Sequence, residues 1–88
     1  MSESSIEYKH CKRVKDQGGT SYKFVSPNRR GVPDRLDLFP ILPEHREIVA
    51  KYVTFTEIKD TGEKPRPEQI REHNRLRELG FNVEVVDR

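Results

Sequence analysis

Two charged side chains interrupt an apolar strand face in this chain. Residues 52–59 alternate with a period of two, so Glu57 and Lys59 lie on the same face as Phe55. A third candidate, Asp34, lies at the start of the preceding predicted strand. If these two strands pair as neighbours, the carboxylates of Asp34 and Glu57 converge on one patch.

Converging carboxylates repel, and each raises the pKa of the other unless a cation lies between them. Mg²⁺ prefers hard oxygen ligands and keeps several waters, so one or two carboxylates are enough to hold it. A bound Mg²⁺ makes water a better nucleophile, and a nearby lysine stabilises negative charge on a phosphodiester in the transition state. Asp34, Glu57 and Lys59 together therefore indicate phosphodiester hydrolysis. The simpler alternative for each acid is a helix cap or a solvated surface position, because most acids are exposed.

Two predicted helices bring further polar groups to inward faces. One spans residues 3–17 and ends at consecutive glycines, and the other spans residues 66–80 and begins at Pro67. At helical spacing, the inner faces carry Glu7 with His10, Cys11 and Val14, and Gln69 with His73 and Leu76. We expect Glu7 and Gln69 to lie at the site. The histidines are interpreted as half-buried packing groups rather than metal ligands, and Cys11 as an inert core residue.

Four strands are predicted around these helices, over residues 20–26, 32–39, about 49–58 and 81–87. Residues 40–47 are expected to be a connection and residues 60–65 a polar loop. The order is therefore α-β-β-β-α-β, an α/β fold with a mixed sheet of about four strands flanked by two helices. The last two strands should be parallel, because a helix connects them. We expect one domain over residues 1–88.

Basic residues cluster although the net charge is only +2. Local clusters of positive charge fit a polyanion footprint such as DNA, although a solvated, salt-bridged surface is the simpler alternative. The core is thin, since 36% of the residues are charged and 32% are hydrophobic. A homodimer is therefore expected, with a marginally stable monomer as the alternative. The candidate DNA-binding residues are Lys12, Arg29, Arg30 and Arg35.

Several classes of protein are excluded by composition. The single cysteine permits neither an intramolecular disulfide nor a cysteine-based zinc site. No apolar run approaches the roughly 20 residues that span a bilayer, so no membrane association is expected. The polar first ten residues do not resemble a signal peptide. We expect an intracellular, cytoplasmic protein.

The same residues carry a family resemblance. Residues 33–34 (PD) and 57–59 (EIK) resemble the PD-(D/E)-x-K nuclease motif. The wider segments 26–40 (SPNRRGVPDRLDLFP), 55–69 (FTEIKDTGEKPRPEQ) and 76–87 (LRELGFNVEVVD) resemble the virus-type replication-repair nuclease family, VRR-NUC. The resemblance covers nearly the whole chain, from about residue 7 to residue 87.

This resemblance implies a restriction-endonuclease-like core and a Mg²⁺ site, with Mn²⁺ as a substitute ion. Asp34, Glu57 and the backbone carbonyl of Ile58 would be the metal ligands, and Lys59 the catalytic lysine. Glu7 and Gln69 would complete the site from the two helices, through metal-bound water or by orientation. The chain resembles the stand-alone members of the family, which are bacterial or phage-associated. This resemblance implies a homodimer that cuts branched DNA such as four-way (Holliday) junctions. A bacterial or phage-infected host cell is therefore the expected setting.

Two other functions remain open at this point. One is a DNA-binding module that recognises branched structure without cutting, motivated by the basic residues. The other is a small interaction domain in which the inward polar residues form a satisfied structural network. The second alternative predicts that Asp34→Asn lowers stability, whereas a metal site predicts equal or higher stability without metal, because the substitution relieves repulsion.

Overall fold

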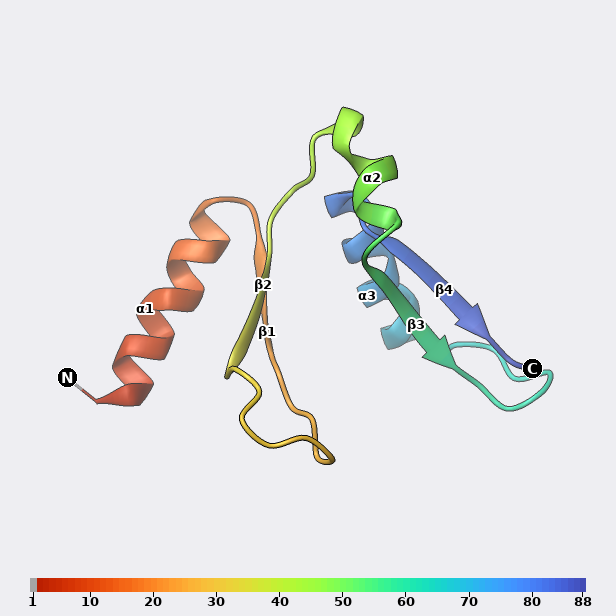
Figure 1. The fold of residues 1–88 in the computed structure, drawn as a ribbon, viewed down its shortest axis with the longest axis horizontal. Coiled ribbons are helices and arrows are strands. Elements are labelled where there is room, and N and C mark those ends of the chain that lie inside the picture. Colours follow the sequence, from red (N-terminus) through yellow and green to blue (C-terminus); the bar gives the residue numbers. More distant parts are fainter. Residues whose placement is uncertain (1) are drawn as a thin grey trace. The chain divides into compact units, whose positions relative to one another are not determined.

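The structure, a computed structural model, describes residues 2–88. Its elements are shown in Figure 1: α1 (Glu3–Asp16), β1 (Thr20–Lys23), β2 (Arg35–Leu38), the 3₁₀ turn η1 (Pro43–His45), α2 (Arg46–Ala50), β3 (Thr54–Ile58), α3 (Pro67–Leu79) and β4 (Asn82–Val86). The α/β class and the predicted order of the four strands and two long helices are confirmed. The chain up to Phe39 forms one compact unit and Pro40–Arg88 forms another. Each unit is described by itself.

The first unit consists of α1 and the antiparallel pair β1–β2. Helix α1 begins at Ser2, whose hydroxyl accepts the Ser5 backbone N–H at 3.2 Å, so the predicted serine cap is present. The predicted inner face is also confirmed, because Val14 is only 3% exposed and Glu7 is half-buried. The strand register runs from Thr20 opposite Leu38 to Lys23 opposite Arg35.

Two polar contacts tie α1 to β2. Arg35 Nε donates to Glu7 Oε2 at 2.8 Å, and His10 Nε2 lies 2.7 Å from Asp37 Oδ2. Ser21 Oγ of β1 donates to the other Asp37 oxygen, Oδ1, at 2.7 Å. The pKa of Asp37 is lowered, chiefly by the hydrogen bond from Ser21 and further by His10. The helix is therefore held to the hairpin by ionised side chains as well as by apolar packing.

Both strands of this hairpin are shorter than predicted. The regular pairing ends at Lys23 and Arg35, and one further backbone bond joins Phe24 N–H to the Asp34 carbonyl at 2.9 Å. Beyond it, Pro33 has no N–H to donate, so the ladder cannot continue in the regular way. Asp34 consequently lies just before β2 rather than inside a strand.

The prediction that a strand begins at about residue 49 is wrong, because Arg46–Ala50 is the short helix α2. The β-branched pair Ile48 and Val49 favoured a strand, but tertiary contacts hold the segment against the end of α3. Ile41 N–H donates to the Leu79 carbonyl at 2.8 Å, and Arg46 Nε donates to the Ile41 carbonyl at 3.3 Å. The preceding segment 40–47, expected to be irregular, also contains η1.

Gly80 ends α3 and makes room for the side chain of Arg46. It has a φ of 107°, and a Cβ atom there would lie 2.7 Å from Arg46 Nε. Glycine adopts this left-handed backbone without steric cost, so it suits the helix end. The approach of Arg46 to Gly80 is a second reason why the segment before β3 is held near the end of α3.

The second unit is a β-α-β arrangement in which β3 and β4 are parallel, as predicted. The register runs from Thr54 beside Asn82 to Ile58 beside Val86. Its core contains an edge-to-face pair of Phe55 and Phe81, with ring centroids 5.7 Å apart. Both rings are half-buried, and the buried residues of this unit are His73, Leu76, Leu79 and Val83.

The four strands pair two by two. Among residues 2–88 the hydrogen-bonded pairs are β1–β2 and β3–β4, which form two two-stranded sheets instead of the single mixed sheet that we expected. Each pair lies within one unit, where the connection between its strands permits pairing. The pairing of β2 with β3, which was the condition for Asp34 to meet Glu57 across neighbouring strands, is not among these pairs. Within the described part of the chain, every helix is too short or too polar to cross a membrane.

Candidate active site

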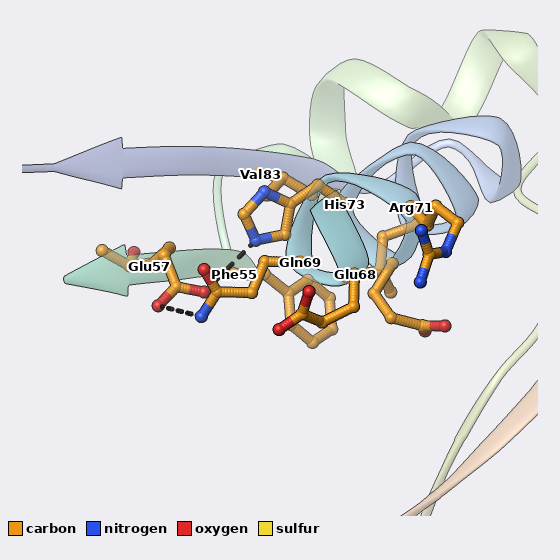
Figure 2. Close-up of a pocket in the computed structure, with 10 residues that line it drawn as sticks. Phe55, Glu57, Glu68, Gln69, Arg71, His73 and Val83 are labelled. Atoms are coloured by element: carbon orange, nitrogen blue, oxygen red, sulfur yellow. Dashed lines mark hydrogen bonds and ion pairs between the residues drawn. The ribbon is translucent and has the colours of Figure 1, made fainter. Parts of the chain in front are cut away.

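Glu57 is the centre of a cluster of polar side chains in the second unit. Its Oε2 atom accepts a hydrogen bond from Gln69 Nε2 at 3.3 Å, and its Oε1 atom lies 3.3 Å from His73 Nε2. Lys59 Nζ lies 4.0 Å from Oε2. Figure 2 shows Gln69 and His73 reaching the Glu57 carboxylate from α3. One carboxylate is therefore contacted by an amide, an imidazole and an ammonium group.

Local geometry explains how these side chains come together. Along β3, Phe55 and Glu57 share the less exposed face, and Lys59 follows on the same parity. On α3, Gln69 and His73 are four residues apart and therefore project from the same side of the helix. The parallel β3–β4 pair requires a crossover connection, and α3 provides it.

The cluster is largely shielded from solvent. The side chains of Lys59, His73 and Glu57 are 10%, 11% and 25% exposed, respectively. In such surroundings an ammonium beside a carboxylate interacts more strongly than it would in bulk water. The cluster therefore places a lysine beside a carboxylate in a partly desolvated position.

Gln69 is fixed by two hydrogen bonds. Its Oε1 accepts the backbone N–H of Arg66 at 2.9 Å, which caps the first turn of α3. This bond assigns the oxygen to the helix cap and leaves the amide nitrogen directed at Glu57. The segment RPEQ (66–69) thus starts the helix and also places the Gln69 amide N–H against Glu57.

A pocket of about 460 Å³ lies beside the cluster. Glu57, Gln69 and His73 line it together with Phe55, and Figure 2 shows Arg71 farther along α3. Phe55 gives this pocket an apolar wall, and Glu57, Gln69 and His73 give it polar groups. The pocket is thus large enough to admit part of a substrate to Glu57.

The first unit carries the other two predicted acidic residues. Glu7 and Asp34 both line a second pocket, of about 480 Å³, where Arg35 is also present. Glu7 is already paired with Arg35, and the hydrogen bond that Arg35 donates to Glu7 raises the pKa of Arg35 above its usual value. Asp34 is exposed. Glu7 and Asp34 thus share a pocket of the first unit, and their roles in a metal site stay predictions.

The predicted DNA-binding residues all lie in the first unit. Arg29 and Arg30 are exposed in the turn before β2. Lys12 is exposed on α1 and lies 3.3 Å from Asp16. Arg35 differs from the others, since its side chain is mostly covered by its contact with Glu7. Arg29 and Arg30 are therefore the most accessible cations of the set.

The structure therefore brings together Glu57, Lys59 and Gln69, with the Ile58 carbonyl next to Glu57 in the chain. The meeting of Asp34 with Glu57 stays a prediction, because the two residues belong to different units. Within residues 2–88, no three histidine, cysteine or acidic side chains form a group that could hold a metal ion. Glu57 and the carbonyl of Ile58, both in the second unit, offer oxygen, which is the kind of ligand that Mg²⁺ prefers.

His73 is the member of the cluster whose contact the sequence did not reveal. Its burial agrees with the prediction of a packing residue, since the whole residue is 8% exposed. Its contact with Glu57 was not predicted. The sequence did carry one indication of this contact. His73 follows Gln69 by four residues, and two polar residues one helical turn apart can reach the same partner.

Comparisons with known proteins place the chain in a known family. No family model matches the chain. The chain is 49% identical over 87 residues to "Putative nuclease p44" of Acyrthosiphon pisum secondary endosymbiont phage 1, covering 99% of this chain and 84% of the phage protein. It is also 35% identical in sequence to a solved structure described as "VRR_NUC domain", covering 97% of this chain and 83% of that one. The chain belongs to the VRR-NUC nuclease family.

The VRR-NUC assignment confirms the resemblance carried by the PD and EIK segments. It rests on the sequence identities, because the superposition with the solved structure gives a TM-score of 0.40 and supports no argument of its own. The alignments extend over almost the entire chain, so they include both units of this VRR-NUC protein.

Proposed function

We propose that the protein is a Mg²⁺-dependent DNA endonuclease that hydrolyses phosphodiester bonds. The observation that carries the proposal is the half-buried Glu57 carboxylate with Lys59 and Gln69 beside it. Nuclease chemistry is supported by the family and by the name of the phage relative. Metal dependence is supported by the oxygen donors that the proposed site would contain.

Each residue has a distinct role in this proposal. Asp34, Glu57 and the carbonyl of Ile58 would hold Mg²⁺, or Mn²⁺ in its place. The ion, when bound, supplies an activated water and charge stabilisation at the phosphate. Lys59 orients the attacking water or neutralises negative charge as it develops on the phosphate. Gln69 holds the Glu57 carboxylate, and Glu7 acts from α1 through water or by orientation.

The proposed substrate is branched DNA, such as a four-way junction, cut by a homodimer. Paired cuts need two active sites, which a two-fold symmetric dimer provides. The exposed turn residues Arg29 and Arg30 support DNA binding, since arginine can contact phosphate oxygens through two parallel hydrogen bonds. Lys12 and Arg35 would extend this surface. The phage relative supports an intracellular role in a bacterial or phage-infected cell, in the cytoplasm.

Cleavage assays test the activity. Labelled duplex, flap and four-way-junction DNA would be incubated with the protein in Mg²⁺, in Mn²⁺ and in a chelator. We expect metal-dependent cleavage, with the junction preferred. Lys59→Ala should reduce the rate by on the order of 10²–10³-fold, and Asp34→Ala should do the same. Lys51→Ala is the matched control, because Lys51 is an exposed lysine of the same unit outside the cluster.

Two results would contradict parts of the proposal. Cleavage that survives both Lys59→Ala and Asp34→Ala would show that the active site lies elsewhere. Tight junction binding with no cleavage in Mn²⁺ would favour a DNA-binding module, the alternative that the exposed basic residues support. The oligomeric state would be measured separately by sedimentation equilibrium, where a monomer at assay concentration would contradict the dimer.

A further inference from the structure

We propose that His73 is a positioning residue that fixes the Glu57 carboxylate for metal binding. The inference rests on the proposed function and adds a residue to it. His73 Nε2 lies 3.3 Å from Glu57 Oε1, and its side chain is 11% exposed. In this role the ring nitrogen Nε2 carries the proton and donates to the carboxylate oxygen, which accepts it. Figure 2 shows this contact beside the one from Gln69.

The two contacts reach different oxygens of Glu57. Gln69 Nε2 donates to Oε2, and His73 Nε2 lies against Oε1, both at 3.3 Å. Both donors come from α3 and are one helical turn apart. A carboxylate held at both oxygens cannot rotate freely about its terminal bond, whereas one held at a single oxygen can. The pair therefore sets the plane of the Glu57 carboxylate before any ion arrives.

The held carboxylate keeps the capacity to bind a cation. Two carboxylate oxygens offer about four lone-pair directions, and the contacts from α3 use one at each oxygen. Lys59 Nζ, at 4.0 Å from Oε2, lies beyond hydrogen-bonding distance and occupies none of the remaining directions, so these can accept a ligand or water. Hydrogen bonds of this kind, made by residues behind a metal ligand, typically contribute about 10–100-fold to metal affinity or activity.

A purely structural role for His73 makes a different prediction. The imidazole is buried and lines the pocket together with the core residues Leu76 and Val83, so it also fills space. If filling space were its whole role, an apolar residue of similar size would preserve metal binding. If its N–H positions Glu57, an apolar replacement would weaken metal binding while the protein remains folded. Metal affinity in the absence of DNA separates these roles.

The experiment compares His73→Leu, which keeps bulk but removes the donor, with His73→Gln, which restores a donor. Mn²⁺ binding would be measured by calorimetry without DNA, and the Mg²⁺ concentration for half-maximal cleavage would be measured with a four-way junction. His73→Leu is expected to weaken Mn²⁺ binding about 10-fold or more, and His73→Gln to recover most of that affinity. Leu79→Met is the matched core control, because Leu79 is buried on α3 and does not line the pocket beside Glu57.

Each outcome decides between the two roles. Unchanged Mn²⁺ affinity in a folded His73→Leu protein would overturn the positioning role, and so would an equal reduction in His73→Leu and His73→Gln. If His73→Leu does not fold, His73→Met takes its place as the variant without a donor. Wild-type protein that neither binds Mn²⁺ nor cleaves DNA would overturn the proposed function and this inference together. Wild-type binding and cleavage with normal affinity in His73→Leu would overturn the inference alone.

Discussion

Lys59 Nζ lies 4.0 Å from Glu57 Oε2, and the lysine side chain is only 10% exposed. The two residues follow each other on one face at the end of β3, next to Phe55. An exposed lysine side chain can adopt many rotamers, whereas that of Lys59 is largely covered and lies beside the Glu57 carboxylate. Its ammonium is therefore placed where it can act on a group bound at Glu57.

Lys59→Met should separate metal binding from catalysis. Methionine preserves much of the side-chain length but has no charge, so the fold and Mn²⁺ binding are expected to persist. The cleavage rate should fall by on the order of 10²–10³-fold, because charge on the phosphate is no longer stabilised. Single-turnover cleavage and calorimetry with Mn²⁺ measure the two properties. A variant that cuts at the wild-type rate would remove Lys59 from the mechanism.

Asp34→Asn tests whether Asp34 serves a site or a structural network. Asp34 is exposed, and its backbone carbonyl, which the substitution retains, accepts the Phe24 N–H. Unfolding free energy in the presence of a chelator should therefore stay within about 0.5 kcal/mol of wild type or rise. Denaturant melts measure it, with Asp16→Asn as a surface control. A clear decrease in stability would instead support a structural network around Asp34.

The lowered pKa of Asp37 predicts that the first unit becomes less stable in acid. The hydrogen bond from Ser21 and the contact with His10 lower its pKa below the ordinary value of 3.8, and Arg35 acts in the same direction. Folding therefore favours the ionised form. The resulting stability is complete above the unfolded pKa and is lost as pH falls through the lower folded pKa.

Ser21→Ala should reveal this contribution. Its melting temperature should lie below that of wild type at about pH 6, and the difference should shrink as the pH falls below 3.8 and through the lower pKa of folded Asp37. Thermal melts across this range provide the measurement, and Ser4→Ala at an exposed position of α1 is the control. A difference that stays constant with pH would mean that Ser21 contributes without ionised Asp37.

Arg29 and Arg30 should contribute to DNA affinity by binding phosphates. Both are exposed, and neither forms an ion pair with any residue in the range 2–88. Replacing both by alanine should weaken binding and reduce the slope of log K against log salt by about 0.9 for each phosphate that the protein no longer neutralises. Titrations in a chelator at several salt concentrations measure the slope. The control is Lys51→Ala/Lys64→Ala, which removes the same charge from exposed positions of the second unit.

The sequence alone predicted the properties that depend on local backbone geometry. The period of two placed Glu57 and Lys59 on one strand face, and the helical period placed Gln69, His73 and Leu76 on one helix face. Serine and glycine predicted the start of α1 and the end of α3. These patterns repeat every few residues and need no knowledge of distant contacts, so they also predicted the order of the main elements and the parallel β3–β4 pair.

Contacts between distant residues were decided by the tertiary structure. His73 and Gln69 meet Glu57 because α3 crosses between β3 and β4 and buries Leu76 and Leu79 in the same core. Arg46–Ala50 is helical despite its β-branched residues, because Ile41 and Arg46 are bonded at the end of α3. Glu7 pairs with Arg35 because α1 packs on the hairpin. Burial of apolar side chains decides which faces meet. The free energy gained by this burial over the whole chain is larger than the backbone preference of any short segment.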